Sequence, residues 1–582
     1  MSQAAGNRKR VAIVGGGAAG MSAAYALSLC PGDFEVVLYE RSSSPGGMAT
    51  STPINAMKYG ASYINDGVQG GSPVFGNTYS MFETLGCTPS EVGFQISFGR
   101  EVGEDYWSNV FPAALLDQHK DSIKRFSTFL KVTSNPVLEP VFGLMPIHAS
   151  LTLFRFPKAF AEALVFPLVA LFMGTGNQTP YVSTAIVERL FTDKSMRLFD
   201  YSKESFVNGI PEMRAFPCLE EVYRRWKKEV ESRGNAEVRL RVEVTGIQRA
   251  VKYVDQSNGQ KCEGVKIYSR ATLGTNNDQE IEGYAGAETE EMFSDVIIAC
   301  DADAALKALG KDASWMEKKV LGNVKYLWDI TVTHNDLGYL EKYYRVRFSD
   351  DLPSKKRLDE GDEETKKAVE FAKDNFKPLY YVRSYPEDKK KIEMSFDLTN
   401  YQPQFKGESR FGPGGDGKKG KFGEDQTKDG HAGNALDTRK STHAESLSEG
   451  EVPPLEDHVF QTIFLDKDGS EGMWTKGEID KEKVIAEKWW KQQSHRWQHY
   501  AGTVPWMMFL NGKRHTYFAG AWTILNMHEI AVCSGLGAAY RLGAPYPFAD
   551  KPEELCGRLF KLTLGVNHGM RARKEDRNGF IA

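Results

Sequence analysis

Residues 11–20 read Val11-Ala12-Ile13-Val14-Gly15-Gly16-Gly17-Ala18-Ala19-Gly20, an apolar run that leads into closely spaced glycines. The run 11–14 has the length and β-branched composition of a buried parallel strand. The segment from Ala18 to about Leu29, rich in Ala and Leu, predicts a helix after the turn. A second strand over 34–39 ends at an acid. This order of elements predicts an α/β fold with a parallel sheet.

The glycines of the turn match G-x-G-x-x-G at Gly15, Gly17 and Gly20. Gly15 would permit the tight turn, Gly17 the approach of a pyrophosphate, and Gly20 close packing of the helix on the strand. The helix would offer free N–H groups to phosphate. Glu40, at the end of the second strand, is placed to accept hydrogen bonds from an adenosine ribose. We therefore predict a dinucleotide site and disfavour a glycine turn without a ligand, but the motif leaves open which dinucleotide binds.

The composition fits a globular protein with more than one structural unit. The chain has 582 residues, 41% of them hydrophobic, and a formal net charge of −4, which gives no reason to expect a nucleic-acid partner. The seven cysteines form no C-x-x-C pair, which suits a reducing compartment. No secretory signal and no membrane-spanning run are found, so a cytoplasmic protein is expected. No metal site is predicted.

A second pair of glycines follows the acid, in Arg41-Ser42-Ser43-Ser44-Pro45-Gly46-Gly47-Met48. With this pair the sequence resembles the superfamily of FAD-dependent amine oxidases, protoporphyrinogen oxidases and phytoene desaturases. The resemblance implies that FAD is the dinucleotide and that Gly46 and Gly47 pass close to it, where a side chain would collide. Many members of that superfamily carry Arg where this chain has Met48, so only a backbone contact is implied there.

The resemblance also implies contacts with FAD from distant parts of the chain. Residues 58–64 resemble a segment beside the flavin ring, although a plain strand of small residues explains them equally well. Val244 matches a valine that contacts adenine through its backbone, and residues 516–522 match a strand that reaches the phosphates. The implied cofactor-binding residues are Gly15, Gly17, Ala18, Ala19, Gly20, Glu40, Arg41, Gly46, Gly47, Met48, Ala61, Ser62, Tyr63, Val244, Gly520, Ala521, His528 and Glu529.

Two residues are catalytic candidates. His528 lies in the loop that passes the flavin in the superfamily, where it could carry a proton; a structural histidine is the alternative. Bacterial members continue His-Glu-Asp, whereas Ile530 follows Glu529 here. Lys325 lies one position from a lysine that holds a water against flavin N5 in amine oxidases, although a solvated surface lysine is the favoured interpretation.

The FAD segments lie at the start, middle and end of the chain, which implies a discontinuous, doubly wound FAD-binding domain and a second, mixed helix and sheet substrate domain. The predicted division gives the FAD domain residues 8–100, 235–318 and 505–550, and the substrate domain residues 101–234 and 319–504. Residues 403–454 are rich in Gly, Lys, Asp and Glu, so a flexible polar insertion is expected within the substrate domain. A helix rich in Lys and Trp is expected from about Lys483 to Gln493.

The most apolar run, residues 163–173, is too short to span a bilayer and is interrupted by Pro167. A buried core helix is the favoured interpretation. A lipid-binding wall or a peripheral anchor at a membrane surface are the alternatives.

Three functions follow from these predictions. The first is an FAD-dependent oxidase or desaturase that removes hydride from a hydrophobic or amphiphilic small molecule, with O2 as the electron acceptor. The second is a flavin-dependent double-bond isomerase of a fatty acid or similar lipid, and the third is a non-catalytic flavoprotein. The sequence does not indicate the substrate or the oligomeric state.

Overall fold

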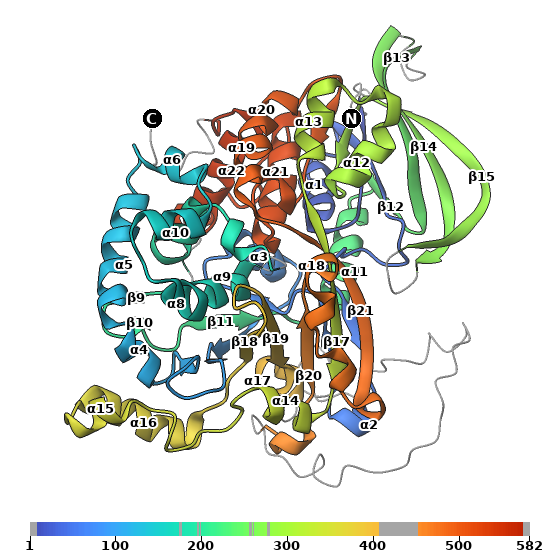
Figure 1. Cartoon of the computed structure of the whole chain (residues 1–582). Helices are drawn as coiled ribbons and strands as arrows, with labels where there is room; N and C mark the ends of the chain where they lie inside the picture. Colours follow the sequence, from blue (N-terminus) through green and yellow to red (C-terminus); the bar gives the residue numbers. More distant parts are fainter. Residues whose placement is uncertain are drawn as a thin grey trace.

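The computed structural model describes residues 8–173, 177–194, 197, 199–254, 259, 261–275, 280–406 and 452–573. A five-stranded sheet carries the glycine turn, and each neighbouring pair of its strands is parallel (Figure 1). In spatial order the strands are β12 (Ala236–Arg239), β2 (Phe34–Tyr39), β1 (Lys9–Val14), β16 (Asp295–Ile298) and β22 (Thr516–Phe518). The two predicted strands are confirmed. The order grows outward in both directions from β1, as in a doubly wound fold.

Two helices from opposite ends of the chain pack on this sheet with their backbones in contact. Helix α1 (Ala18–Ser28), predicted from the sequence, lies against α21 (His528–Leu542) (Figure 1). A Cβ atom at Gly535 would lie 2.0 Å from Ala19 O. A Cβ atom at Gly20 would lie 1.8 Å from Gly15 O. Glycine at these two positions therefore lets α1 begin directly against β1 and lets α21 return to it.

A seven-stranded sheet forms the second layer, with the order β21-β17-β20-β19-β18-β7-β8. Its strands are β21 (Val484–Gln493), β17 (Tyr326–His334), β20 (Phe460–Phe464), β19 (Ile392–Asp397), β18 (Tyr380–Ser384), β7 (Ile96–Phe98) and β8 (Trp107–Ser108). The helix predicted over 483–493 is therefore wrong. These residues form an edge strand that pairs with β17 along its whole length, and this tertiary pairing overrides the helical propensity of Lys, Glu, Ala and Gln.

The apolar run 163–173 lies inside the protein. Its first part belongs to a π-helical turn (Ala161–Val165) and the rest forms α9 (Phe166–Met173), which packs against β18 and β19. Leu164, Leu168 and Val169 are each at most 1% exposed. The prediction of a core helix is confirmed for residues 164–171, and a contact of this run with a membrane surface gains no support from these covered side chains. In the part of the chain that the structure describes, no helix combines the length and apolarity needed to cross a bilayer.

A long antiparallel ribbon leaves the parallel sheet beside β2. It consists of β13 (Val242–Val254), β14 (Lys261–Thr275) and β15 (Ile281–Phe293), and Val244 lies near the start of β13 (Figure 1). The predicted division into two discontinuous domains stays a prediction. Most of the predicted insertion, residues 407–451, lies outside the described residues. Its first residues do not behave as an insertion, because Pro403–Phe405 form a 3-10 turn in which Gln404 and Phe405 are buried.

Candidate functional site

The glycine turn forms a backbone cradle at the carboxyl ends of β1 and β2. Gly15 has a φ of +107° and donates its N–H to Tyr39 O over 2.8 Å. A Cβ atom at Gly15 would lie 2.9 Å from Ala299 O. At Gly17, by contrast, the atom nearest to an added Cβ is Gly47 Cα, at 4.0 Å. The space beside Gly17 is open, so the lack of a side chain there leaves room for a bound group.

The second glycine pair closes the other side of this cradle. Gly46 donates its N–H to Gly16 O over 2.9 Å and forms a parallel β-bridge with Gly17. Gly46 and Gly47 have φ values of +138° and +62°, in the region that favours glycine. Helix α1 begins between the two loops, without a side-chain cap and without an acidic residue in its first turn. These free N–H groups, together with the helix dipole, make the cradle suited to a phosphate anion.

Glu40 lies beside the cradle and is fixed by backbone N–H groups. Its Oε2 accepts from Gly16 N over 2.6 Å and its Oε1 from Ser42 N over 2.8 Å. Each carboxylate oxygen can accept a second hydrogen bond, so the group can still bind a hydroxyl in the cavity that it lines. Val242 N donates to Glu40 O over 2.8 Å, which places Val244 on the same wall.

One cavity of about 950 Å³ connects these groups with the seven-stranded sheet. Most of the predicted cofactor-binding residues line it. They are Gly15, Gly17, Ala18, Ala19, Glu40, Arg41, Gly46, Gly47, Met48, Val244, Gly520, Ala521 and His528. Gly20 lies just behind the wall, where its role is the close helix packing that the motif predicts. Their roles toward a ligand stay predictions.

Residues Ala61, Ser62 and Tyr63 do not line the cavity, and their role as cofactor contacts stays a prediction. Residues 63–65 form a short strand that pairs with residues 51–53, and Ala61 packs in an apolar cluster with Phe396, which also lines the cavity. The cavity wall is instead made by the following residues, 67–72. The sequence signal for this wall is the pair Gly70-Gly71, where added Cβ atoms would collide with Tyr401 and Phe75.

Glu529 also lies outside the cavity wall. Its Oε1 accepts from Asn77 N over 2.9 Å and from Asn77 Nδ2 over 2.8 Å, and its Oε2 accepts from Thr78 N over 2.7 Å. The carboxylate is 1% exposed and caps the N-terminus of α3 (Gly76–Thr84). Glu529 therefore fastens α21 to α3, and its contact with the cofactor stays a prediction.

Lys325 is exposed just before β17 and does not line the cavity, and its catalytic role stays a prediction. Lys488, on the strand β21 that was expected to be a helix, does line the cavity, as do Lys307 and Lys491. Lys488 Nζ lies 3.1 Å from Asp66 Oδ2 and 2.9 Å from Thr50 Oγ1. This ion pair sits beside Gly67, at the start of the wall formed by residues 67–72.

His528 lines the cavity and has a partner on each ring nitrogen. Nδ1 lies 3.0 Å from Thr78 Oγ1 and Nε2 lies 2.9 Å from Tyr223 Oη. The rings of Phe82 and Phe216 lie 5.9 and 5.6 Å from the imidazole, centroid to centroid. Burial lowers the pKa of His528 to about 4, so the ring is neutral at pH 7. Because one nitrogen then donates and the other accepts, neither is left to exchange a proton with the cavity.

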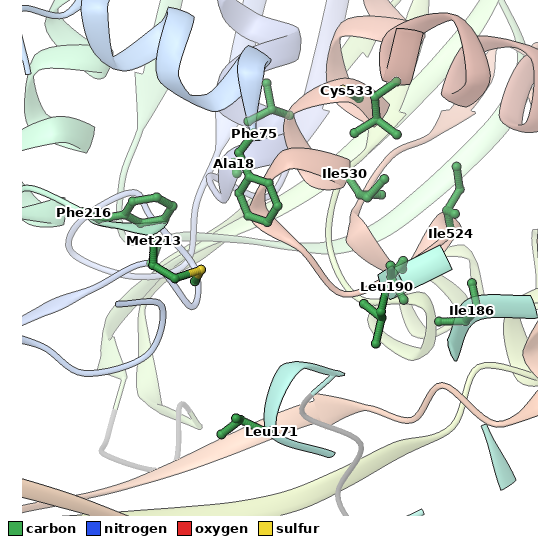
Figure 2. Packing of buried hydrophobic residues seen from close by; sticks show 14 of the residues in the cluster. Ala18, Phe75, Leu171, Ile186, Leu190, Met213, Phe216, Ile524, Ile530 and Cys533 are labelled. Atoms are coloured by element: carbon green, nitrogen blue, oxygen red, sulfur yellow. The ribbon is translucent and has the colours of Figure 1, made fainter. Parts of the chain in front are cut away.

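An apolar chamber forms the end of the cavity next to the seven-stranded sheet, and sequence reasoning missed it. Tyr380 stands at its centre, with ring centroids 5.0 Å from Phe94, 4.4 Å from Phe396 and 5.6 Å from Tyr401. Figure 2 shows Phe75 and Met213 near the start of α1, with Leu171 of α9 across from them. The chamber residues are Phe75, Phe94, Leu171, Met213, Tyr380, Met394, Phe396, Tyr401, Ile463 and Leu465.

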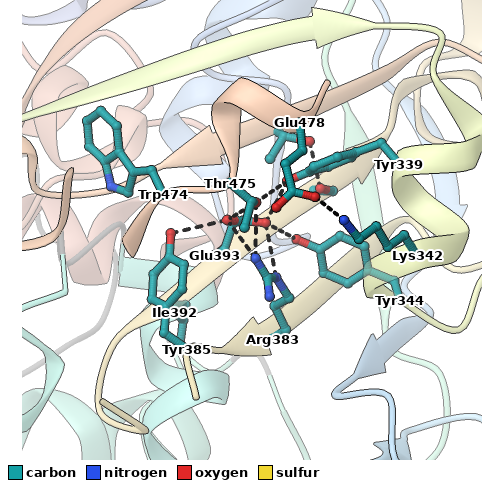
Figure 3. Close-up of polar contacts among 12 residues, drawn as sticks. Tyr339, Lys342, Tyr344, Arg383, Tyr385, Ile392, Glu393, Trp474, Thr475 and Glu478 are labelled. Atoms are coloured by element: carbon teal, nitrogen blue, oxygen red, sulfur yellow. Dashed lines mark hydrogen bonds and ion pairs between the residues drawn. The ribbon is translucent and has the colours of Figure 1, made fainter. Parts of the chain in front are cut away.

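The charged side chains of this part of the sheet lie on its opposite face. Along β19, Met394 and Phe396 line the chamber, whereas Glu393 points away and is fully buried. Figure 3 shows Glu393 held by Arg383 and by hydroxyl groups. Arg383 Nη2 lies 3.1 Å from Glu393 Oε2, and Thr475 Oγ1 donates over 2.8 Å. The carboxylate is fully engaged there, and the alternation of the strand leaves the chamber face apolar.

Comparisons with known proteins agree with this geometry. Residues 13–80 match a family described as an NAD(P)-binding Rossmann-like domain. The fold as a whole is similar to that of a putrescine oxidase solved with putrescine bound, at 12% identity and a TM-score of 0.51, covering 93% of this chain and 100% of the other. It is equally similar to cyclohexylamine oxidase from Brevibacterium oxydans IH-35A, at 10% identity and a TM-score of 0.51, covering 92% and 100%. No curated protein sequence matches the chain. The chain therefore has the fold of these amine oxidases, with a Rossmann-like domain at its start.

The buried imidazole of His528 makes a prediction about acid stability. The pKa is about 4 in the folded protein and 6.5 for the free side chain. Between these pH values the unfolded chain binds a proton at His528 that the folded chain does not bind. The free energy of unfolding therefore decreases as the pH falls from 6.5 to 4. When the pH is lowered from 7 to 5, the free energy of unfolding of the wild type should fall by about 2 kcal/mol more than that of His528→Gln, because glutamine does not titrate. Urea unfolding at both pH values measures this difference.

Tyr223→Phe is the matched control, because it removes a hydrogen-bond partner and keeps the buried imidazole. It should lose stability by a similar amount at both pH values. A His528→Gln variant with the pH dependence of the wild type would show that the imidazole is not buried in its neutral form.

Proposed function

We propose that this chain is an FAD-dependent oxidoreductase that oxidises a hydrophobic or amphiphilic small molecule. The observation that carries the proposal is one continuous cavity, which joins a glycine-lined anion cradle to an aromatic and aliphatic chamber. An extended dinucleotide suits the first part, since side chains at Gly17 and Gly47 would fill the space that it needs. An apolar substrate suits the second part.

The residues of the cavity fit the successive parts of FAD. The glycine loops and the start of α1 would hold the pyrophosphate, Glu40 would bind ribose hydroxyls, and Val244 would contact adenine. Residues 67–72 and Tyr223 would line the flavin end. When bound, FAD supplies two-electron chemistry, accepting a hydride from a C–H bond of the substrate, with O2 as the final electron acceptor.

The protein groups around the chamber would orient the substrate and keep water away from it. Because His528 has both nitrogens occupied, we assign it a positioning role: it holds the start of α21 against Thr78 and Tyr223. Lys488, paired with Asp66, is a cationic group beside Gly67 at the start of the wall of residues 67–72. In this assignment His528 does not carry a proton; it keeps the protein around the flavin end in a fixed conformation.

A second function, double-bond isomerisation of a lipid, is favoured by one observation. The chamber is lined by aromatic and aliphatic side chains, as an acyl chain would require. A non-catalytic flavoprotein is the third candidate. The putrescine bound by the putrescine oxidase is a dication, and the described residues that line the chamber include no carboxylate to pair with it.

Gly17→Val tests the cofactor site. The backbone at Gly17, with φ −71° and ψ −176°, suits valine, and no protein atom lies closer than 4.0 Å to the new Cβ. The variant should therefore fold with an unchanged melting temperature in the absence of cofactor but fail to bind FAD. Calorimetric titration of the purified protein with FAD measures the loss.

Gly32→Val is the control for this substitution, because a Cβ at Gly32 meets no atom within 4 Å and the residue lies far from the cradle in a surface turn. It should keep full affinity for FAD. A Gly17→Val protein that binds FAD as the wild type does would refute the cofactor assignment.

The reaction class is tested by mixing the FAD-loaded protein with a panel of amines, alcohols and unsaturated fatty acids without oxygen. An oxidase or desaturase should show lasting bleaching of flavin absorbance near 450 nm with its substrate, and the colour should return when air is admitted. Product formed without lasting bleaching would identify an isomerase. No bleaching and no product across the panel would support a non-catalytic role.

A further inference from the structure

The distribution of carboxylates along the cavity bears on the charge of its substrate. Four acidic residues line the cavity, and all belong to the cofactor end: Glu40 after β2, Glu243 on β13, and Asp301 and Asp303 at the start of α12 (Ala302–Leu309). Each has a partner in the protein. Glu40 accepts two backbone N–H groups, Glu243 accepts the hydroxyl of Tyr284, and both aspartates pair with Lys491.

The chamber, in contrast, has walls without a carboxylate among its described residues. Its strands do carry one acid, but Glu393 lies on the far face of the sheet and is bound to Arg383. An ammonium group that entered the chamber would lose its hydration without gaining a counter-ion, which costs several kcal/mol. The cationic Lys488 near the chamber adds to this penalty.

An amide side chain adjoins the chamber where a cation site would need a carboxylate. Gln69 belongs to the wall of residues 67–72 and is 7% exposed. Its Nε2 donates to Gln461 Oε1 over 2.8 Å, and Gln461 Nε2 donates to Thr333 Oγ1 over 3.3 Å. Gln461 pairs with Phe396 of the chamber in the sheet. Gln69 Oε1 has no hydrogen-bond partner among the described residues, although it is buried.

We propose that the substrate is an uncharged, largely apolar molecule, and that Gln69 provides the neutral hydrogen-bonding group that its polar end meets. The inference rests on the proposed function for the existence of a substrate, and it adds the charge class. An amide orders a hydroxyl or neutral N–H group without attracting a cation as a carboxylate would. The chain Thr333–Gln461–Gln69 fixes the amide, so Gln69 acts as a specificity-determining residue.

The test compares two probes of nearly equal shape, 1-naphthylmethanol and 1-naphthylmethylammonium, by calorimetric titration of the purified protein at pH 7. The wild type should bind the alcohol at least about tenfold more tightly than the ammonium. Gln69→Glu, which adds a carboxylate of the same shape, should reduce this ratio by about tenfold. Gln69→Leu should weaken binding of the alcohol severalfold and leave binding of the ammonium unchanged.

Gln248→Glu is the matched control, because Gln248 is exposed on β13 and the substitution adds the same charge outside the cavity. It should leave the ratio at the wild-type value. Wild-type protein that binds the ammonium as tightly as the alcohol, or that binds neither probe, would overturn the proposal. A ratio in Gln69→Glu equal to that in Gln248→Glu would overturn the role of Gln69.

The FAD content of every sample, measured from its absorbance after denaturation, separates this inference from the proposed function. Discrimination between the probes by protein that cannot bind FAD would support the neutral chamber and refute the flavoenzyme. FAD-loaded protein that does not discriminate between the two probes would support the flavoenzyme and refute the neutral chamber.

Discussion

Gly46 donates its backbone N–H to the carbonyl of Gly16, and this bond holds two glycine loops against each other at the end of β1. A Cβ atom at Gly46 would lie 2.6 Å from Ala49 O, and one at Gly20 would lie 1.8 Å from Gly15 O, so both loops need glycine to keep this conformation. Every other part of the site is built around this cradle. Strand β22 ends beside it, and Gly520 N is tied to Ser534 of α21 over 2.8 Å. Distant parts of the chain therefore meet at a gap that the protein itself does not fill.

The two ends of the cavity differ in the charged and polar groups that line them. At the cradle, free N–H groups and paired acids create a polar environment for an anionic dinucleotide. At the chamber, the alternation of β19 puts Met394 and Phe396 inside and Glu393 outside, so the charged network stabilises the sheet without entering the cavity. His528 lies between these environments as a neutral ring with both nitrogens bound. The arrangement would suit a dinucleotide whose charged pyrophosphate lies at the cradle and whose reactive ring lies next to the chamber.

The local sequence was sufficient to predict the role of a residue where its own backbone conformation determines that role. The roles of Gly15, Gly20 and Gly46 follow from turn geometry, and the sequence predicted them together with β1, α1 and β2. It failed where tertiary pairing decides, as for Lys488, whose segment has the composition of a helix and becomes a strand only because β17 lies beside it. The chamber could not be predicted for the same reason. Tyr380 and Ile463 are ordinary strand residues and Phe94 lies between two strands, and only the tertiary fold brings them together with α9. The bonds of Glu529 to α3 could not be predicted either, because these helix-capping partners lie about 450 residues away in sequence.

The central claim is that the cradle selects FAD among the dinucleotides, and competition between FAD and NAD⁺ tests it most directly. The protein, freed of any bound nucleotide, would be titrated with each compound by calorimetry under the same conditions. The account predicts one FAD per chain and an affinity for FAD at least on the order of a hundredfold above that for NAD⁺. Equal or tighter binding of NAD⁺, or no binding of FAD, would contradict it.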